Sequence, residues 1–287
     1  MRNKNISYWA FLAPTLLAVF FVLILPIIIG TYYSFTDYDG FNVNGFVGFQ
    51  NYIDLMSDSQ FLYSLWFTFG VSVVSIILIN TIGLGFALIV TKRLGRFSTI
   101  FRTIYFMPNL IGGIILGFIW QFIFLKTFES LGEITGFEFL SGWLSTTATG
   151  FWGLVILFTW QMSGYIMVIY VSFLNNIPGE LIEAASIDGA SPWQNFWKIK
   201  FPMLAPAFTI SLFLTLSNAF KIYDQNMALT NGGPYDSTEM TAMNIYNTAF
   251  RVQDMGYGQA KALIFLGLIA LISVVQLYFT RKREVDL

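Results

Sequence analysis

The chain has 287 residues, of which 56% are hydrophobic, 18% aromatic and only 11% charged. This composition is too apolar for an ordinary soluble domain and predicts a membrane protein. A net charge of −1 provides no basic surface, so no nucleic-acid partner is expected. Without cysteine or histidine, the chain lacks a disulfide framework, a thiolate metal site and the usual proton shuttle.

Long uncharged segments divide the chain, and each supplies about 20 apolar residues, the length that crosses a hydrocarbon layer of about 30 Å. The predicted spans are 9–33, 62–91, 103–125, 151–174, 203–223 and 261–280. Residues 1–287 are therefore expected to form a single all-α membrane domain with six transmembrane helices. The first span ends in Thr31-Tyr32-Tyr33 instead of small cleavage-site residues, so we expect it to remain as a helix.

Basic residues occur in alternate connections between these spans. Of the 15 Lys and Arg residues, 11 follow this pattern: Arg2, Lys4, Lys92, Arg93, Arg96, Arg102, Lys198, Lys200, Arg281, Lys282 and Arg283. The first two connections on the other side are rich in Asp and Glu. Because basic connections stay in the cytoplasm, both termini and the connection 177–202 are predicted to be cytoplasmic.

The 177–202 loop carries start and stop signals for two short helices. Pro178 suits the first turn of the first helix, and Gly189 suits a left-handed C-terminal cap. Ser191 and Gln194 have the spacing of a capping box, and the proline at position 202 is expected to end the second helix. Two locally capped helices around a glycine turn make a rigid projection, which suits docking to another protein.

The residue spacing within this loop is specific. Glu183-Ala184-Ala185, three residues, Gly189, nine residues, Ile199, one residue, a large apolar residue and Pro202 together resemble the EAA loop of bacterial ABC importer permeases. The Ile187-Asp188-Gly189-Ala190 core and the later Thr230-Asn231-Gly232-Gly233-Pro234 are similar to the carbohydrate-uptake branch, which includes maltose and multiple-sugar permeases. Phe201 departs from the leucine usual in that family but keeps its bulk.

This resemblance implies a permease subunit of an ATP-driven importer for sugars or oligosaccharides in a bacterial inner (plasma) membrane. It also implies a second permease subunit forming a heterodimer, two ATPase subunits, an extracytoplasmic sugar-binding protein and surrounding membrane lipid. The chain itself is then non-catalytic and binds no cofactor, because the ATPase subunits hold ATP and magnesium. In agreement, the sequence has no Gly-x-x-x-x-Gly-Lys-Ser/Thr phosphate loop and no soluble segment large enough for an ATPase domain.

The same resemblance assigns the contact with the ATPases to the 177–202 loop. The residues concerned are Glu183, Ala184, Ala185, Asp188, Gly189, Ile199 and Pro202. Ala184, Ala185 and Asp188 fall at helical spacing, which places small side chains beside an acidic rim and permits close backbone approach. The alternative is an amphipathic helix at the membrane surface whose acidic side chains are only solvated.

Polar residues within the spans predict a substrate path, formed by Asn109, Gln161, Tyr165, Ser211, Thr215 and Asn218. The last three recur at i, i+4 and i+7 in the fifth span, and the polar stripe continues into Lys221, Asp224 and Gln225. Polar side chains that face lipid are costly, so these should face the helix bundle. Amides and hydroxyls near aromatic rings suit an uncharged polyhydroxyl ligand. Alternatively, these groups only hold the helices together.

Three other functions stay open from the sequence. A permease for another small polar solute would share every feature above. An ion-coupled secondary sugar carrier is disfavoured, because no Asp, Glu, Lys or Arg lies in the middle of a predicted span. A structural membrane subunit would leave uptake intact when the polar stripe is altered.

Overall fold

A computed structural model describes residues 2–91 and 96–282, without the side chains of residues 2–7 and 96. Lys92, Arg93 and Arg283, which contribute to the basic pattern, lie outside the described residues. The side chains of Arg2, Lys4 and Arg96 are likewise not described.

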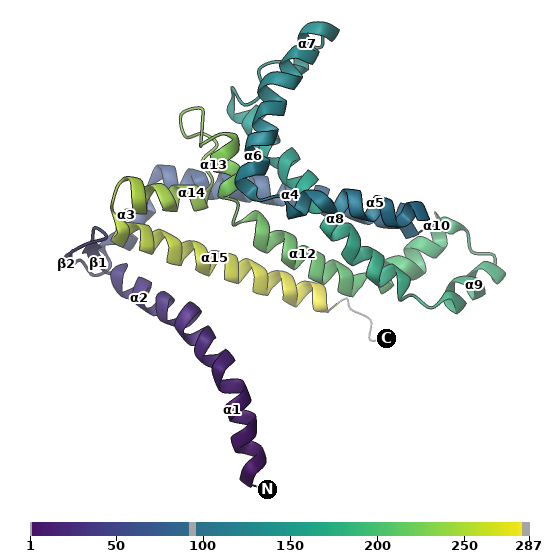
Figure 1. The fold of residues 1–287 in the computed structure, drawn as a ribbon, viewed down its shortest axis with the longest axis horizontal. Coiled ribbons are helices and arrows are strands. Elements are labelled where there is room, and N and C mark those ends of the chain that lie inside the picture. The colour runs from purple at the N-terminus through teal and green to yellow at the C-terminus, as the bar shows by residue number, and fades with distance from the viewer. Residues whose placement is uncertain (1, 92–95, 283–287) are drawn as a thin grey trace. The chain divides into compact units, whose positions relative to one another are not determined.

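Most of the described residues are helical, which confirms the expected all-α membrane fold (Figure 1). The α-helices are α1 Arg2–Val19, α2 Leu25–Tyr33, α3 Gln50–Ser57, α4 Ser59–Thr91, α5 Arg96–Phe106, α6 Gly113–Phe122, α7 Glu129–Thr135, α8 Thr147–Asn175, α9 Gly179–Ile187, α10 Pro192–Asn195, α11 Phe201–Met203, α12 Ala205–Ala219, α13 Asp224–Leu229, α14 Thr241–Tyr246 and α15 Met255–Arg281. Short π-helical segments lie at η1 Phe20–Ile24, η3 Ile123–Phe128, η5 Phe196–Lys200 and η6 Asn247–Arg251, and 3₁₀ turns lie at η2 Met107–Leu110 and η4 Glu138–Leu140.

The chain forms two compact units. Unit 1 comprises residues 1–62 and 244–267, and unit 2 comprises residues 63–243 and 268–287. Five helical segments of the described chain are long and apolar enough to cross a membrane: Tyr8–Tyr33, Ser59–Thr91, Gly113–Thr135, Thr147–Asn175 and Met255–Arg281. The bent pair Pro192–Met203 and Ala205–Ala219 makes a sixth if it counts as one span.

The third predicted span, 103–125, does not coincide with one helix. α5 ends at Phe106, the 3₁₀ turn η2 follows, and α6 starts only at Gly113. Pro108 lacks the N–H that a continuing α-helix needs, and the adjacent glycines 112 and 113 favour a break. The apolar segment that follows the break, Gly113–Thr135, is the one long enough to span a membrane.

The fifth predicted span, 203–223, is also interrupted. Pro202 does not end the second helix of the loop, because it lies in the first turn of α11, which continues to Met203. The chain then bends by 64° at Leu204, which is fully buried. α12 begins at Ala205 and ends at Ala219, before the predicted end.

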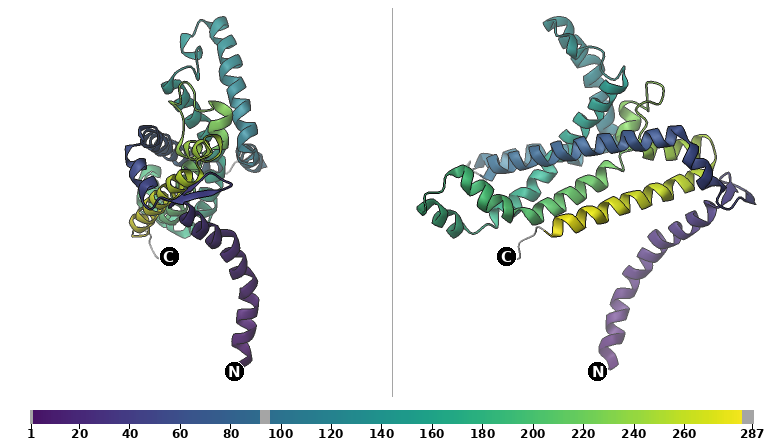
Figure 2. Two further views of the ribbon diagram at one scale, coloured as in Figure 1. Left: turned by 90° about the vertical axis from the view of Figure 1, so that its left-hand side faces the viewer. Right: turned by 180° about the vertical axis from the view of Figure 1, so that it is seen from behind.

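α8 is the central helix of unit 2. In its most apolar 18-residue window 72% of the residues are buried, compared with 33% for α4. A buried hydrogen-bond chain connects three helices: the Tyr170 hydroxyl donates to Asn80 Oδ1 over 2.9 Å, and Asn80 Nδ2 donates to Thr215 Oγ1 over 3.3 Å. This chain joins α8 to α4, the unbroken helix running beside it in Figure 2, and to α12.

A glycine permits the closest approach to α8. A Cβ atom at Gly164 would overlap the backbone carbonyl oxygen of Tyr105 near the end of α5. Only glycine therefore allows the α5 backbone to pack directly on α8.

Unit 1 contains two short β-strands, the only strands among the described residues. Strands β1 Thr36–Tyr38 and β2 Val43–Phe46 form an antiparallel ribbon, which the sequence reading missed. Asp39 closes the turn, since its Oδ1 accepts hydrogen bonds from the N–H groups of Phe41 and Asn42 over 2.8 and 2.7 Å. These two bonds hold the pKa of the Asp39 carboxyl below its usual value.

Unit 1 also contains a buried ion pair. Lys261 Nζ lies 2.8 Å from Asp58 Oδ2, and their side chains are 4% and 19% exposed. Lys261 also donates to Asn244 Oδ1 and Thr248 Oγ1 over 3.0 and 2.9 Å. Asp58 accepts the Phe61 N–H over 2.9 Å, so it caps α4 while it pairs with α15. Burial raises the pKa of Asp58, but the hydrogen bonds from Lys261 and Phe61 outweigh burial and lower it below its usual value.

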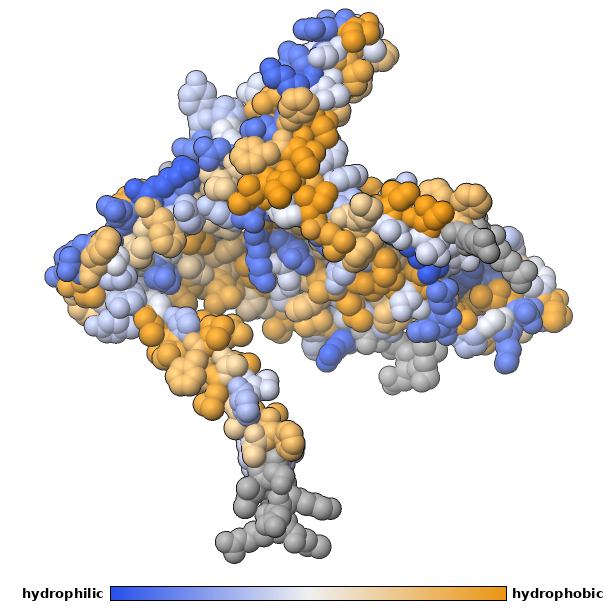
Figure 3. All heavy atoms as spheres, viewed as in Figure 1, coloured by the Kyte–Doolittle hydropathy of each residue, from blue (hydrophilic) through white to orange (hydrophobic). Residues whose placement is uncertain are grey.

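Large apolar side chains lie on the outer surface of several spans. α6 exposes Ile114, Ile115, Phe118, Ile119 and Phe122, which form the orange band along α6 in Figure 3. In the most apolar window of the first span, Tyr8–Tyr33, no residue is buried within the chain. Such surfaces fit a helix in contact with lipid or with another membrane subunit.

Candidate functional site

The first helix of the 177–202 loop ends in a left-handed turn. Gly189 has φ of +80°, as the sequence predicts. The Ala190 N–H donates to the Ala185 carbonyl over 2.9 Å, and the Gly189 N–H donates to the Ser186 carbonyl over 3.2 Å. This is the Schellman pattern, which satisfies the last carbonyls of a helix. Pro178 lies just before the helix, as its N-cap residue, instead of in the first turn.

The second helix of the loop starts with the predicted capping box. The Ser191 N–H donates to Gln194 Oε1 over 2.8 Å, and the Gln194 N–H donates to Ser191 Oγ over 3.3 Å. Both helix ends around the turn are thus fixed by bonds between residues close in sequence. A hollow of about 460 Å³ lies between the two helices, with Asp188 and Lys198 among the residues around it.

The predicted docking residues have the following positions. Glu183, Ala184, Asp188, Gly189 and Pro202 are exposed, whereas Ala185 and Ile199 are half-buried. Two large apolar side chains of the loop, which were not among the predicted docking residues, are strongly exposed: Ile187 is 86% exposed and Trp193 is 70% exposed. Their signal was present in the sequence, because both large apolar residues lie beside a capped helix end.

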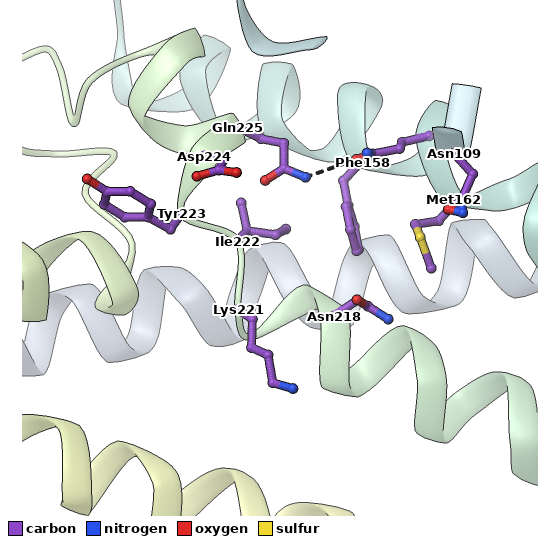
Figure 4. A pocket seen from close by; sticks show the side chains of 10 residues that line it. Asn109, Phe158, Met162, Asn218, Lys221, Ile222, Tyr223, Asp224 and Gln225 are labelled. Atoms are coloured by element: carbon purple, nitrogen blue, oxygen red, sulfur yellow. Dashed lines mark hydrogen bonds between the residues drawn. The ribbon is translucent and has the colours of Figure 1, made fainter. Parts of the chain in front are cut away.

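Three of the predicted path residues line one cavity of about 380 Å³ in unit 2 (Figure 4). The complete lining is Asn109, Phe158, Gln161, Met162, Asn218, Lys221, Ile222, Tyr223, Asp224 and Gln225. The side chain of Lys221 points away from the other polar groups in Figure 4. Among residues 2–91 and 96–282, neither Lys221 nor Asp224 forms an ion pair. Phe158, Met162, Ile222 and Tyr223 complete the wall and were not predicted.

Gln161 joins two walls of this cavity. Its Oε1 accepts a hydrogen bond from Gln225 Nε2 over 3.0 Å, and its Nε2 donates to the Ile111 carbonyl over 3.3 Å. Gln161 is buried, so its amide fixes the start of α13 and the turn before α6.

Asn218 is exposed to the cavity and donates from Nδ2 to the Leu214 carbonyl over 2.8 Å. Within the described part of the chain no hydrogen bond is made to its Oδ1.

Close packing of α6 against α13 determines the position of the cavity wall that α13 forms. A Cβ atom at Gly113 would lie 2.7 Å from Asp224 Cβ, and one at Gly117 would lie 2.5 Å from Ala228 Cβ. The spacing Gly113-Ile-Ile-Leu-Gly117 is the small-xxx-small pattern that lets membrane helices approach closely. This pattern, which the sequence reading did not use, sets the position of Asp224 and Gln225.

The other three predicted path residues lie away from the cavity. Thr215 is fully buried, and its Oγ1 donates to the Ser211 carbonyl over 2.8 Å and accepts from Asn80. Ser211 is also fully buried. Tyr165 is half-buried and its ring packs against Phe106, with ring centres 6.3 Å apart. For Thr215 this placement fits the alternative in which polar groups hold helices together.

Among the residues that the structure describes, no group of Asp, Glu, His or Cys is placed to hold a metal ion. The cavity instead offers amides, the Asp224 carboxylate, the Lys221 side chain and aromatic or aliphatic walls. Such a surface can bind a polar ligand by hydrogen bonds and by contact with flat apolar faces.

Known proteins similar to this chain include two permeases. The chain is 53% identical to a probable starch degradation products transport system permease protein, AmyD, of Thermoanaerobacterium thermosulfurigenes, over 99% of this chain and 97% of that protein. It is 33% identical to the multiple sugar-binding transport system permease protein MsmF of Streptococcus mutans serotype c, over 96% of each.

The fold is similar to that of a chain in the crystal structure of a bacterial ABC transporter involved in the import of the acidic polysaccharide alginate. The TM-score is 0.84 at 19% identity, over 98% of this chain and 96% of that one. A second crystal structure, of a bacterial alginate ABC transporter in complex with an alginate pentasaccharide-bound periplasmic protein, matches with a TM-score of 0.79 at 19% identity, over 97% of this chain and 93% of that one.

The family model of the binding-protein-dependent transport system inner membrane component matches residues 79–285. That range includes the 177–202 loop and the whole cavity lining. Together with the relatives that align along nearly the full length, this match shows that the chain belongs to the family of inner membrane components of binding-protein-dependent transport systems.

Proposed function

We propose that this multi-pass membrane protein is the permease subunit of an ATP-driven importer for sugars or oligosaccharides. The observation that carries the proposal is the 53% identity to a permease named for starch degradation products, together with a second relative named for multiple sugars. The neutral amides and apolar walls of the 380 Å³ cavity fit a polyhydroxyl ligand. The chain is non-catalytic in this proposal, and ATP and magnesium are held by partner subunits.

The 177–202 loop is the proposed contact with two ATPase subunits. Its two capped helices present exposed acidic and apolar side chains, which include Glu183, Ile187 and Trp193. Exposed apolar side chains on a locally rigid projection are typical of a docking surface.

In the topology predicted from the basic connections, the loop and both termini are cytoplasmic. A second permease subunit completes the path, and an extracytoplasmic sugar-binding protein delivers the ligand.

The cavity is the proposed part of the substrate path. Asn109, Asn218 and Gln225 contribute amide groups to it, and the Gln161 amide holds Gln225 in place. The sugar then contacts Asn109, Asn218 and Gln225, whereas Gln161 acts through Gln225.

The test is uptake of radiolabelled maltooligosaccharides by cells with and without the gene for this chain. Loss of uptake on deletion, restored by the gene and abolished by a Walker-A Lys→Ala variant of the ATPase, would support an ATP-driven importer. Uptake that survives the ATPase variant would instead support an ion-coupled carrier. Unchanged uptake on deletion, with loss of another polar solute, would support a permease for that solute.

A further inference from the structure

The loop between α13 and α14 presents an isolated aromatic ring. This loop, residues 230–240, stands out beside α13 in Figure 1. The side chain of Tyr235 is 100% exposed. Tyr235 and Asp236 have φ values of +51° and +56°, and Asn231 has +47°. Left-handed backbone is unfavourable for a large side chain, so the loop holds Tyr235 against its own conformational preference.

Hydrogen bonds within the loop fix this conformation. Thr238 is fully buried, and its Oγ1 donates to the Gly233 carbonyl over 2.7 Å. Asn226 is also fully buried; its Nδ2 donates to the Thr238 carbonyl over 2.9 Å, and its Oδ1 accepts the Met240 N–H over 2.9 Å. Strained backbone persists where its surroundings over-determine it, and such places cluster at functional sites.

Two further bonds attach the loop to the long helices of unit 2. The Tyr63 hydroxyl on α4 donates to the Ser237 carbonyl over 2.9 Å. Thr147 Oγ1, at the start of α8, donates to Ser237 Oγ over 2.8 Å. The residues on both sides of the exposed ring are therefore anchored, and the ring sits on a rigid support.

We propose that Tyr235 is an anchor residue through which this loop docks the extracytoplasmic sugar-binding protein. The proposal rests on the proposed function, which supplies the partner and places the loop outside the cell. A tyrosine has few side-chain torsions to order on binding, and a rigid loop loses little freedom. An exposed ring on a preorganised support is therefore suited to fill a pocket on a protein partner, where tyrosines often dominate the binding energy.

The sequence around Tyr235 argues against one alternative partner, the lipid bilayer. Residues 231–239 read Asn-Gly-Gly-Pro-Tyr-Asp-Ser-Thr-Glu, so the ring has no large apolar neighbour in the loop. An interfacial anchor usually combines aromatic with other apolar side chains, and within the described loop no large apolar side chain besides Tyr235 is exposed. The loop thus favours a protein partner.

The experiment measures the affinity of the assembled transporter in lipid nanodiscs for its receptor. The receptor used is the extracytoplasmic protein that stimulates ATP hydrolysis by the wild-type transporter. Tyr235→Asn removes the ring while favouring the same left-handed backbone, so the loop should keep its shape. We expect its Kd to rise about thirtyfold, the range of a dominant interface residue, whereas Tyr235→Phe should stay within about threefold of wild type.

A second measurement separates the two partners directly. A photo-crosslinking benzoylphenylalanine at position 235 should form an adduct with the receptor in proteoliposomes. An adduct with lipid only, or a Tyr235→Asn transporter with wild-type Kd, would overturn the anchor role. If no receptor stimulates the wild-type transporter, the failure lies with the proposed function and not with Tyr235.

Discussion

Gly189 is the residue on which the geometry of the 177–202 loop depends most directly. Its φ of +80° is unfavourable for any L-residue with a side chain, and most of all for a β-branched one. We expect Gly189→Val to destabilise the turn by about 1–2 kcal/mol and to misalign the two loop helices. Sugar uptake and copurification of the ATPase should then fall together, measured in the same membranes.

Gly189→Asn is the matched control, because asparagine tolerates the left-handed region better than other side chains. No atom lies within 4 Å of the position where its Cβ would be, so the added Cβ meets no obstacle. The Asn variant should keep most of the copurified ATPase. Equal loss in the Asn and Val variants would mean that the side chain itself, and not the backbone, disturbs docking.

Asn218 is the most accessible of the predicted path residues. Asn218→Leu keeps similar bulk but removes the cavity-facing amide, and a lost hydrogen bond to a neutral group costs about 1 kcal/mol. Sugar uptake should therefore slow about fivefold, with normal yield of the assembled transporter. Radiolabelled uptake and complex yield are measured on the same preparation.

Thr215→Val provides the contrast to Asn218→Leu, since Thr215 lies in the buried chain with Asn80 and Tyr170. Removing the Thr215 hydroxyl should lower the Tm of the transporter. The transporter that still assembles should take up sugar at a nearly unchanged rate. Normal uptake in the Asn218→Leu variant would remove Asn218 from the path.

At the residue scale, the parts of the site that could be predicted are those with local causes. The Gly189 turn and the Ser191–Gln194 capping box depend only on residues a few positions away, and the structure has both. The path residues differ, because a polar side chain on α12 can face either the cavity or the neighbouring helices. Asn218 faces the cavity, whereas Thr215 accepts a hydrogen bond from Asn80, which lies 135 positions earlier in the chain.

At the element scale, the contact between α6 and α13 gives a sharp test. A Cβ atom at Gly117 would meet Ala228 Cβ at 2.5 Å, so Gly117→Ala should push α13 away and destabilise the protein by about 1–3 kcal/mol. The cavity wall carried by Asp224 and Gln225 should move with it. We expect a lower apparent Tm in detergent and slower uptake.

Gly85→Ala in α4 is the control for this change. A Cβ atom at Gly85 meets nothing within 4 Å, so alanine should only improve helix propensity, by about 1 kcal/mol. The two Gly→Ala variants should thus shift the Tm in opposite directions. Adding Ala228→Gly to Gly117→Ala removes the overlap of the two Cβ atoms and should recover part of the lost Tm, because a Cβ at 117 would still lie 3.2 Å from the Gln225 carbonyl oxygen. No recovery at all would mean that the loss has another origin.

The buried pair of Asp58 and Lys261 gives a prediction for the thermal stability of unit 1. Lys261→Met leaves the Asp58 carboxylate, whose side chain is 19% exposed, without its charged partner, although the Phe61 N–H and the Tyr257 hydroxyl still donate to it. Breaking a fully buried pair costs about 3–5 kcal/mol, so the loss here should lie below that range. We expect a marked fall in Tm at pH 7, partly recovered when Asp58→Asn is added. A double variant no more stable than Lys261→Met alone would contradict this.

The same pair predicts how the stability of the protein changes with pH. The pKa of Asp58 lies below its usual value of 3.8, so the folded state favours the ionised carboxylate. This stabilisation is fully present above about pH 4 and is lost as pH falls through the lowered pKa. The Tm difference between wild type and Asp58→Asn should therefore narrow in acid, as measured between pH 3 and pH 7.

At the element scale, helix existence was predictable but several boundaries were not. The break between α5 and α6 had local signals in Pro108 and the glycine pair at 112–113, but the continuous apolar character of 103–125 outweighed them. The 64° bend at Leu204 also had a local signal, in the flanking prolines at 202 and 206, but the apolar character of 203–223 outweighed it.

For the whole molecule, the predicted topology is directly testable. The chain contains no cysteine, so single substitutions can be labelled without background. Asp39→Cys and Asp236→Cys should react with a membrane-impermeant maleimide added to intact spheroplasts. Lys198→Cys should react only after the membrane is opened. Labelling of Lys198→Cys from outside would reverse the proposed orientation of the 177–202 loop.

Apolar composition at this scale predicts entry into the membrane but not which neighbour each surface meets. The most apolar window of Tyr8–Tyr33 is as hydrophobic as a lipid-facing helix, and none of it is buried within the chain. A helix against lipid and a helix against a second permease subunit have the same apolar surface, since lipid tails are as apolar as leucine. This part of the assembly therefore could not be predicted from the sequence.

The open space around Gly189 has a consequence for handedness. With φ of +80° and no atom within 4 Å of a built Cβ, the position excludes side chains by chirality and not by volume. A mirror-image residue prefers positive φ, so D-alanine introduced by peptide ligation should fit the native turn and restrict the unfolded chain more than glycine does. The 177–202 loop would then be stiffer than in the natural protein, with its docking surface unchanged.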